Sequence, residues 1–302
     1  MPHMRNAVES FQNHDIVLFT STFYQQDQES INRSKLALDL VRNAYTIGVK
    51  LIIADSSPLA PGENVSQFEK KVRQIIWDSS MINVIRTKKR LEEGTASTMA
   101  DERKQSLEYG LALYPDNNNF LWIEPEKANL VTEESLAKII QTAQETGADF
   151  VIPARAQLTY ILGQDNKKIP DISAGGMNTL PEFQARTETR ANRALRKGTD
   201  EYHDSYFGPV LLKRWTWTEQ WLQSTHPQWG INVLTPIEGK QKWLSVASAP
   251  VIYDYDERQR MFENGEIDGE GNPLSPQEQQ AQAKSYKNKR VTQYSTIVYN
   301  QK

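Results

Sequence analysis

The sequence predicts an α/β protein in which a mainly parallel central sheet is flanked by helices on both faces. Five short apolar runs alternate with segments whose apolar residues recur at helical spacing. Runs of this kind are typical of strands buried on both faces. Strands joined through helices pair in parallel by right-handed crossovers, so the order of elements predicts a Rossmann-like layered domain.

The first half of the chain supplies three of the five strands. Residues 15–22, "DIVLFTST", form an apolar run that closes on hydroxyl side chains, and residues 25–48 follow with helical spacing and a terminal glycine. Residues 49–57, "VKLIIADSS", repeat this pattern, and residues 68–80 supply their helix. A weaker strand is expected at residues 82–87, "INVIRT". Each strand ends on polar residues, which marks the place where the chain leaves the sheet.

The second half continues the alternation. Residues 98–115 predict a helix that a proline stops, and "FLWIE" at residues 120–124 predicts the fourth strand. The next helix begins at Thr132 with the capping pattern "TEES" and ends near Gly147. Residues 149–155, "DFVIPAR", predict the fifth strand.

Composition limits the classes of function. The chain has 302 residues, 38% of them hydrophobic, which suffices for one large domain with a tail. Thirty-five basic and 38 acidic residues give a net charge of −3, which disfavours nucleic acid as the main partner. The chain has no cysteine, which excludes disulfides and thiolate metal sites. No window approaches the roughly 18 apolar residues of a membrane span, so we expect a soluble, cytoplasmic protein.

Three parts are expected along the chain. Residues 1–14 are a polar N-terminal extension, and residues 15–256 form the α/β domain. Residues 257–302 are rich in Gly, Asn, Gln and charged side chains, so they cannot build a core of their own. We expect this last part to be an arm or lid that packs on the domain.

Polar side chains follow the strands and should meet at one rim of the sheet. In a parallel sheet the carboxyl ends of the strands open into a crevice that holds ligands. Ser21 and Thr22, Asp55, and the pair Glu124 and Glu126 follow three of the expected strands. No glycine fingerprint follows the first strand and no GxxxxGK[ST] loop occurs, so neither a dinucleotide dehydrogenase nor a P-loop enzyme is favoured.

The segment "LWIEPEK" places two carboxylates around Pro125. Mg²⁺ and Mn²⁺ prefer carboxylate oxygens and keep water and substrate phosphates as their other ligands, so one or two carboxylates suffice. If the segment is extended, Glu124 and Glu126 point the same way and can share one cation. The alternative is a solvated loop before a helix, whose dipole favours acids near its N-terminus.

These motifs resemble the GT-A fold of nucleotide-diphospho-sugar glycosyltransferases, in which an Asp-x-Asp motif meets a divalent cation and the donor diphosphate. "HPQWGINVLTPIEG" at residues 226–239 is similar to the "WGID" helix start of retaining members such as mannosylglycerate synthase. The likeness covers roughly residues 15–255. It implies a nucleoside-diphosphate sugar as donor, a small molecule or glycan as acceptor, and Mn²⁺ or Mg²⁺ as cofactor. Glutamates in place of aspartates, and the lack of a histidine after the last core strand, depart from the family pattern.

The resemblance also implies roles for single residues. It places the donor nucleotide and its phosphates on Ser21, Thr22, Phe23, Asp55, Arg103 and Lys104. It places the metal on Glu124 and Glu126, with Asp254 in place of the missing histidine. It places the acceptor near Arg186, Arg190, His203, Asp204, Trp229 and Asn232.

Two groups of acceptor candidates, and a pair of tryptophans that could stack on a sugar, have a plainer reading. The arginines of "RTETRANRALRKG" form a basic stripe that is also what a solvated helix face looks like, and the His203–Asp204 pair could be hydrogen-bonded surface. Trp217 and Trp221 share a helical face, which favours core packing over sugar stacking.

The function that these patterns favour is metal-assisted transfer of a sugar from a nucleoside-diphosphate sugar, with a retaining outcome as one possibility. A binding protein on the same fold that does not catalyse transfer is the alternative, because the acidic motif is altered and no general base is identifiable. A nucleotidyltransferase that makes the activated sugar is a third reading.

Overall fold

The structure is a computed structural model that describes residues 16–25, 27–77, 80–87, 99–155, 160–162, 168–170, 203–204, 208–215, 217–226, 230–254, 256–282 and 284–285.

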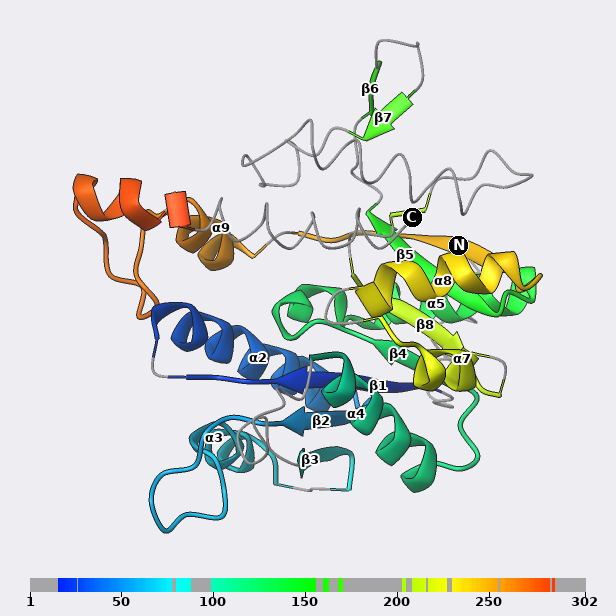
Figure 1. Cartoon of the computed structure of the whole chain (residues 1–302), viewed down its shortest axis with the longest axis horizontal. Coiled ribbons are helices and arrows are strands. Elements are labelled where there is room, and N and C mark those ends of the chain that lie inside the picture. Colours follow the sequence, from blue (N-terminus) through cyan, green and yellow to red (C-terminus); the bar gives the residue numbers. More distant parts are fainter. Residues whose placement is uncertain are drawn as a thin grey trace.

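A seven-stranded sheet runs through the centre of the domain in the order β3-β2-β1-β4-β8-β5-β9 (Figure 1). β8 is antiparallel to both of its neighbours, and the other pairs are parallel. The predicted Rossmann-like α/β class is therefore confirmed, and β8 and β9 join the five predicted strands. The strands are β1 (Ile16–Thr22), β2 (Lys50–Asp55), β3 (Ile82–Arg86), β4 (Asn119–Trp122), β5 (Phe150–Arg155), β8 (Val210–Lys213) and β9 (Val246–Val251); β6 (Tyr160–Leu162) and β7 (Lys168–Pro170) pair separately.

Helices cover both faces of the sheet because the side chains of each strand alternate between two cores. Ile16 and Leu18 of β1 face one core, and Val17 and Phe19 face the other. The first core is closed by α2 (Gln28–Thr46), α3 (Gln67–Ile75), the 3-10 helix η1 (Pro125–Leu130) and α5 (Glu133–Thr146). The second is closed by α4 (Met99–Leu113), α7 (Trp217–Gln223) and α8 (Gly230–Gln241). Trp221 is fully buried, which confirms the core reading of that residue.

Local signals set the helix ends. Thr132 is the N-cap of α5 and accepts from the Ser135 amide at 3.2 Å, as the "TEES" pattern predicts. Gly147 closes the same helix with a left-handed backbone at φ 62°. The predicted helix over residues 68–80 is shorter than expected, because α3 ends at Ile75 and Ile76 is already extended.

The helix α9 (Glu257–Glu263) and the segment that follows it pack on α2. The buried Asn32 side chain donates to Gln259 Oε1 at 2.8 Å and accepts from Arg258 Nε at 2.9 Å. The Gly269 amide donates to Gln28 Oε1 at 2.7 Å, and a Cβ on Gly269 would lie 2.0 Å from the Gln28 carbonyl oxygen. This part of the expected arm therefore packs closely on the N-terminal half of α2.

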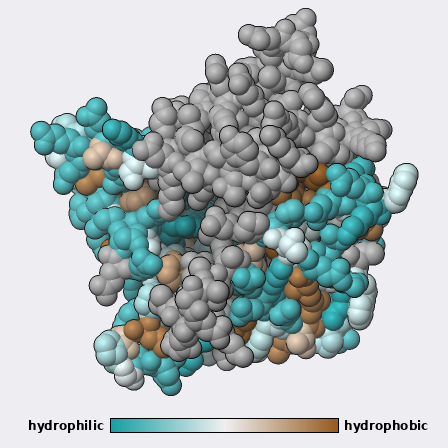
Figure 2. All heavy atoms as spheres, in the orientation of Figure 1, coloured by the Kyte–Doolittle hydropathy of each residue, from teal (hydrophilic) through white to brown (hydrophobic). Residues whose placement is uncertain are grey.

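The surface in Figure 2 is mainly hydrophilic over the described residues of that face, with hydrophobic residues in small separate areas. Among the helices of the described ranges, none combines the length and the apolar character that a membrane crossing requires.

Candidate functional site

A pocket of about 270 Å³ opens at the carboxyl ends of β1 and β4. These strands are neighbours, but the chain leaves β1 toward β2 and β3 and continues from β4 toward the other side of the sheet. This reversal of strand order leaves a crevice, which is the usual ligand position in open α/β sheets. The lining comes from β1, α2, α4 and the end of β4: Ser21, Thr22, Phe23, Tyr24, Gln25, Asp27, Glu29, Ser30, Arg33, Glu102, Arg103, Trp122, Glu124 and Pro125.

The two predicted acids separate at this rim. Glu124 is buried and lines the pocket, whereas Glu126 is the second residue of η1 and pairs with Arg33 of α2. The expected extended geometry from 124 to 126 is wrong, because Pro125 takes the first position of a 3-10 helix, where its fixed φ fits. The two side chains therefore meet different surroundings.

The Glu124 carboxylate lies against the backbone of Gly208, two residues before β8 begins. Gly208 has φ 106°, and a Cβ there would lie 2.8 Å from the Glu124 carboxyl carbon. Only glycine allows the backbone to approach this closely. Lys127 Nζ lies 3.9 Å from Glu124 Oε2.

Arg33 and Glu126 form an ion pair beside the pocket. Burial alone would raise the pKa of Glu126, but the charge and the hydrogen bond of Arg33 outweigh it and lower that pKa. Burial likewise works against the charged form of Arg33, yet Glu126 raises the pKa of Arg33 above its usual value. Both groups are therefore ionised at neutral pH. Arg33 Nη1 also lies 3.6 Å from Glu29 Oε1 of the same helix.

Arg103 approaches the pocket from α4. Its guanidinium lies 4.5 Å from the centre of the Trp122 ring and donates to Asn232 Oδ1 of α8 at 2.8 Å. Burial lowers the pKa of Arg103 to about 10, against the opposite effect of Glu124 and Glu102, so the side chain stays charged at neutral pH. The structure thus joins a predicted donor-site residue to a predicted acceptor-site residue. Lys104 points elsewhere and donates to the Ser224 carbonyl.

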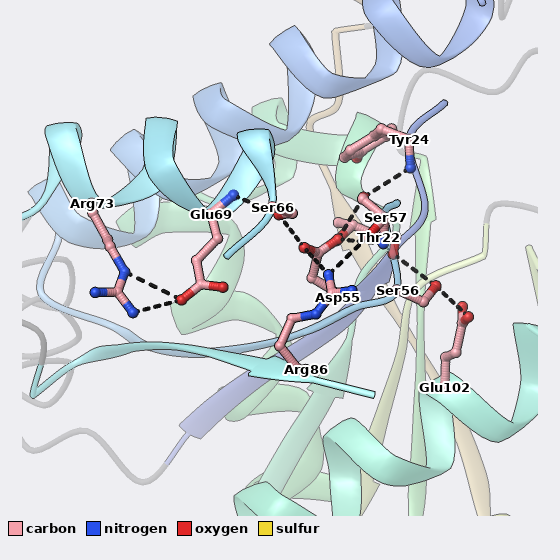
Figure 3. A network of polar contacts seen from close by, with 10 residues as sticks. All are labelled: Thr22, Tyr24, Asp55, Ser56, Ser57, Ser66, Glu69, Arg73, Arg86 and Glu102. Carbon is pink, nitrogen blue, oxygen red and sulfur yellow. Dashed lines mark hydrogen bonds and ion pairs between the residues drawn. The ribbon is translucent and has the colours of Figure 1, made fainter. Parts of the chain in front are cut away.

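Asp55 lies outside the pocket lining and organises the strand ends next to it (Figure 3). It is fully buried, and it accepts from Thr22 Oγ1 at 3.1 Å, from the Ser57 amide at 3.0 Å and from Ser57 Oγ at 2.6 Å. Its second oxygen accepts from Ser66 Oγ and, at 3.1 Å, from Arg86 Nη1. Five donors therefore fix this carboxylate.

The network continues from Asp55 to the pocket wall. Ser57 Oγ also accepts from the Tyr24 amide at 2.9 Å, and Ser56 Oγ donates to Glu102 (Figure 3). Burial, with a smaller contribution from Glu126, raises the pKa of Tyr24 well above its usual value, so its phenol is neutral. The geometry thus places Asp55 as a support for the residues that line the pocket.

Several pocket residues were not expected from the sequence. Tyr24 lies two residues after the expected strand end at Thr22 and directly follows the predicted Phe23, which is a usable signal. Arg33 and Glu29 lie on the polar side of the first predicted helix, and Glu102 lies next to the predicted Arg103. Their spacing marks them only as surface positions of helices, because the pocket arises where two helices pass the strand ends.

Other predicted residues lie away from the pocket lining. His203 and Asp204 are buried, so the surface reading of this pair is wrong. His203 Nδ1 is 2.7 Å from Ser248 Oγ of β9, and Asp204 receives two hydrogen bonds from the Arg155 guanidinium, at 2.7 and 2.9 Å. Asp254 is exposed. Arg186, Arg190 and Trp229 lie outside the described residues.

Because the pocket lining carries a net negative charge, an anionic ligand fits there only if a cation binds with it. The lining has four carboxylates, Asp27, Glu29, Glu102 and Glu124, and two guanidiniums, so its formal charge is 4 − 2 = 2 units negative. Within the part of the chain that the structure describes, no three Asp, Glu or His side chains gather as a metal site. Glu124 alone of the three predicted ligands lines the pocket. Hard cations bound by one or two carboxylates take their other ligands from phosphates and water, so this donor set fits Mg²⁺ or Mn²⁺ that arrives with a ligand.

Comparison with known proteins gives likenesses of shape at low identity. No protein-family model matches the chain, and no curated protein matches it in sequence. Similar solved structures include residues 1–349 of Staphylococcus aureus TarS, with a TM-score of 0.31, 11% identity and 46% of this chain covered. This chain spans 35% of that TarS chain.

Two further structures are covered over most of their length. A CMP:2-keto-3-deoxy-manno-octonic acid synthetase with CTP has a TM-score of 0.44 and 8% identity, over 78% of this chain and 90% of that one. The glucosyl-3-phosphoglycerate synthase of M. tuberculosis has a TM-score of 0.47 and 11% identity, over 97% of this chain and 84% of that one. All three TM-scores lie below 0.5.

Proposed function

We propose that the chain binds a nucleoside-diphosphate sugar in the pocket between β1 and β4 and transfers the sugar to an acceptor. The observation that carries this proposal is the pairing of one buried carboxylate, Glu124, with two guanidiniums, Arg33 and Arg103, at a strand-order reversal. Guanidiniums suit phosphate oxygens, and a carboxylate at the same rim suits the cation that accompanies a diphosphate.

The residues have distinct roles in this proposal. Ser21, Thr22 and Phe23 hold the nucleoside, with Asp55 behind them as support. Arg33 and Arg103 face the phosphates and stabilise the charge that grows on the leaving diphosphate. Glu124 holds the divalent cation, which when bound supplies Lewis-acid stabilisation of that same charge. Asn232 fixes the direction of the Arg103 fork at 2.8 Å.

The pocket wall also keeps water from part of the site. The Trp122 ring lies under Arg103 at 4.5 Å, and a guanidinium in such a partly dry place interacts more strongly with phosphate than it would in water. The class of acceptor, a small molecule or a glycan, and a retaining outcome enter the proposal through the family resemblance alone.

The proposal is tested by titrating the protein with UDP, GDP and their common sugars, with and without Mn²⁺. Metal-dependent binding and slow release of free sugar are expected. Glu124→Gln keeps the size of the side chain and removes its charge, so it should weaken metal-dependent binding by roughly tenfold or more. Glu134→Gln, in the exposed first turn of α5, is the matched control and should leave binding unchanged. Absence of nucleotide binding under every condition overturns the proposal.

One observation favours the alternative of a binding protein that does not catalyse transfer. Glu126 is held by Arg33, so only one acid of the predicted pair lines the pocket. Nucleotide-sugar binding that ignores Mn²⁺, without donor hydrolysis or transfer, supports this alternative. Formation of nucleoside triphosphate from pyrophosphate and the sugar nucleotide would instead identify a nucleotidyltransferase.

A further inference from the structure

Two buried hydrogen-bond donors in the pocket wall have no acceptor. The Tyr24 hydroxyl and Trp122 Nε1 are shielded from solvent, and neither has a hydrogen-bond partner among the residues that the structure describes. Both residues line the pocket. Most buried polar groups in proteins are paired, because a buried donor without an acceptor costs free energy. Two such donors at one pocket indicate that a bound ligand supplies the acceptors.

Trp122 belongs to the wall formed by the second core. It is the last residue of β4 and is 1% exposed. Its ring packs edge-on against Phe19, with the ring centres 5.5 Å apart, so its position is fixed. The Arg103 guanidinium lies 4.5 Å from the centre of the Trp122 ring. The indole N–H and the guanidinium can only donate, so this wall presents two neighbouring donor groups.

Tyr24 belongs to the opposite wall, next to the first core. Its ring packs edge-on against Phe68 at 5.1 Å, and its amide donates to Ser57 Oγ at 2.9 Å (Figure 3). Burial raises the pKa of Tyr24 well above its usual value, Glu126 adds to this effect and Arg33 opposes it. The hydroxyl therefore keeps its proton and lies within the electrostatic reach of the Arg33 guanidinium.

Each guanidinium of the pocket is thus accompanied by one neutral donor. Arg33 and Tyr24 lie on the side of the first core, and Arg103 and Trp122 lie on the side of the second. A hydroxyl group of a ligand would donate as well as accept, whereas phosphate oxygens accept and form charge-assisted hydrogen bonds. Two sets of donors on opposite walls therefore suit two linked phosphates.

We propose that the Tyr24 hydroxyl and the Trp122 indole N–H each donate to one phosphate of a diphosphate, beside Arg33 and Arg103 respectively. This inference rests on the proposed function and deepens it, because it adds two neutral residues that recognise the phosphates. The pocket then prefers a diphosphate to a monophosphate, since only a diphosphate meets both sets of donors.

The first test is a calorimetric titration of the full chain with inorganic pyrophosphate in the presence of Mn²⁺. Tyr24→Phe removes one oxygen atom and should weaken binding by roughly tenfold. It should not lower the melting temperature, because the described contacts of this hydroxyl include no hydrogen bond. Tyr114→Phe is the matched control, because the Tyr114 hydroxyl accepts from Asn83 at 3.1 Å and donates to the Ser80 carbonyl at 3.0 Å. It should lower the melting temperature and leave pyrophosphate binding unchanged.

The second test compares Trp122→Phe with Trp221→Phe. Trp221 is also fully buried, its Nε1 also lacks a partner within the described ranges, and its ring centre is 6.3 Å from that of Trp122, but it does not line the pocket. Both substitutions remove ring volume from the core and should lower the melting temperature. Trp122→Phe keeps an aromatic face for Arg103 and loses the N–H, so it alone should weaken pyrophosphate binding, by roughly tenfold.

Nucleotides assign the two phosphates. One of the two variants, Tyr24→Phe or Trp122→Phe, should weaken UDP and UMP binding alike, and the other should weaken UDP binding only; GDP and GMP serve in the same way. The inference is overturned if the natural sequence binds pyrophosphate and Tyr24→Phe binds it equally well, a result that does not depend on how Trp122→Phe folds. Pyrophosphate binding that both variants weaken, without binding of any nucleotide, supports this inference and refutes the proposed function. If neither pyrophosphate nor a nucleotide binds, both are refuted.

Discussion

Substitutions at Asp55 test whether a buried carboxylate holds the strand ends that form the pocket. Asp55→Asn keeps an oxygen for Thr22 and both Ser57 donors, and Ser66 Oγ can turn to accept from the new amide. Arg86 then faces a donor instead of an anion at 3.1 Å. One charge-assisted hydrogen bond is lost, so the free energy of unfolding should fall by about 2 kcal/mol.

Asp55→Ala should cost more, because all five donors lose their acceptor. Removing one partner of a buried ion pair costs about 3–5 kcal/mol, which is a large share of the roughly 5–15 kcal/mol that stabilises a domain. Equilibrium unfolding in urea measures both variants. Asp39→Asn is the control, because Asp39 forms an exposed pair with Arg42 of the same helix and should change stability by less than about 0.5 kcal/mol. If Asp55→Asn is as stable as the control, the carboxylate does not organise this region.

The remaining predictions concern three other contacts. Gly208→Ala should weaken nucleotide binding by about tenfold or more in a titration, because its Cβ would lie 2.8 Å from the Glu124 carboxyl carbon at φ 106°. Asn32→Ala should lower the free energy of unfolding by about 2–4 kcal/mol in urea, because two buried hydrogen bonds lose their partner. For Glu126, the pKa is lower in the folded state, so its stabilisation is present above the unfolded pKa and is lost as pH falls through the folded pKa. Stability curves against pH for the natural sequence and Glu126→Gln should therefore converge in acid, and a constant gap between them would contradict the role of Arg33.

The strand ends could be predicted from the sequence, but not their partners. Thr22 and Asp55 follow apolar runs, and the structure places them opposite each other, with Asp55 opposite Arg86 of β3. A slip of one residue would turn these side chains to opposite faces of the sheet, and nothing local to either run fixes that register. The row Thr22, Asp55 and Arg86 is therefore a product of tertiary packing.

β8 was missed for a related reason. Val210–Lys213 is a strand of four residues, too short for its apolar pattern to be distinguished from a loop. Its place between β4 and β5 depends on the chain returning across the sheet in the antiparallel direction. This strand also brings Gly208 onto Glu124, so a contact of the candidate site depends on an element that local sequence does not specify.

The acid pair shows how a local rule and a tertiary contact combine. Pro125 turns the chain into η1, and from there Glu126 meets an arginine 93 positions earlier. The pattern "EPE" predicts two acids at a strand end, which is what the structure has, but the direction of the second depends on α2.

The position of α2 in turn depends on the C-terminal segment. Asn32 and Arg33 are adjacent in α2, but their side chains contact different parts of the protein. Asn32 is hydrogen-bonded to Gln259 and Arg258, whereas Arg33 lines the pocket and pairs with Glu126. A buried asparagine whose partners come from a segment about 227 positions away cannot keep its place if that segment leaves. Since one turn of helix carries both residues, release of the segment would move a guanidinium of the pocket wall as well. The described part of this segment therefore packs on the helix that carries Arg33.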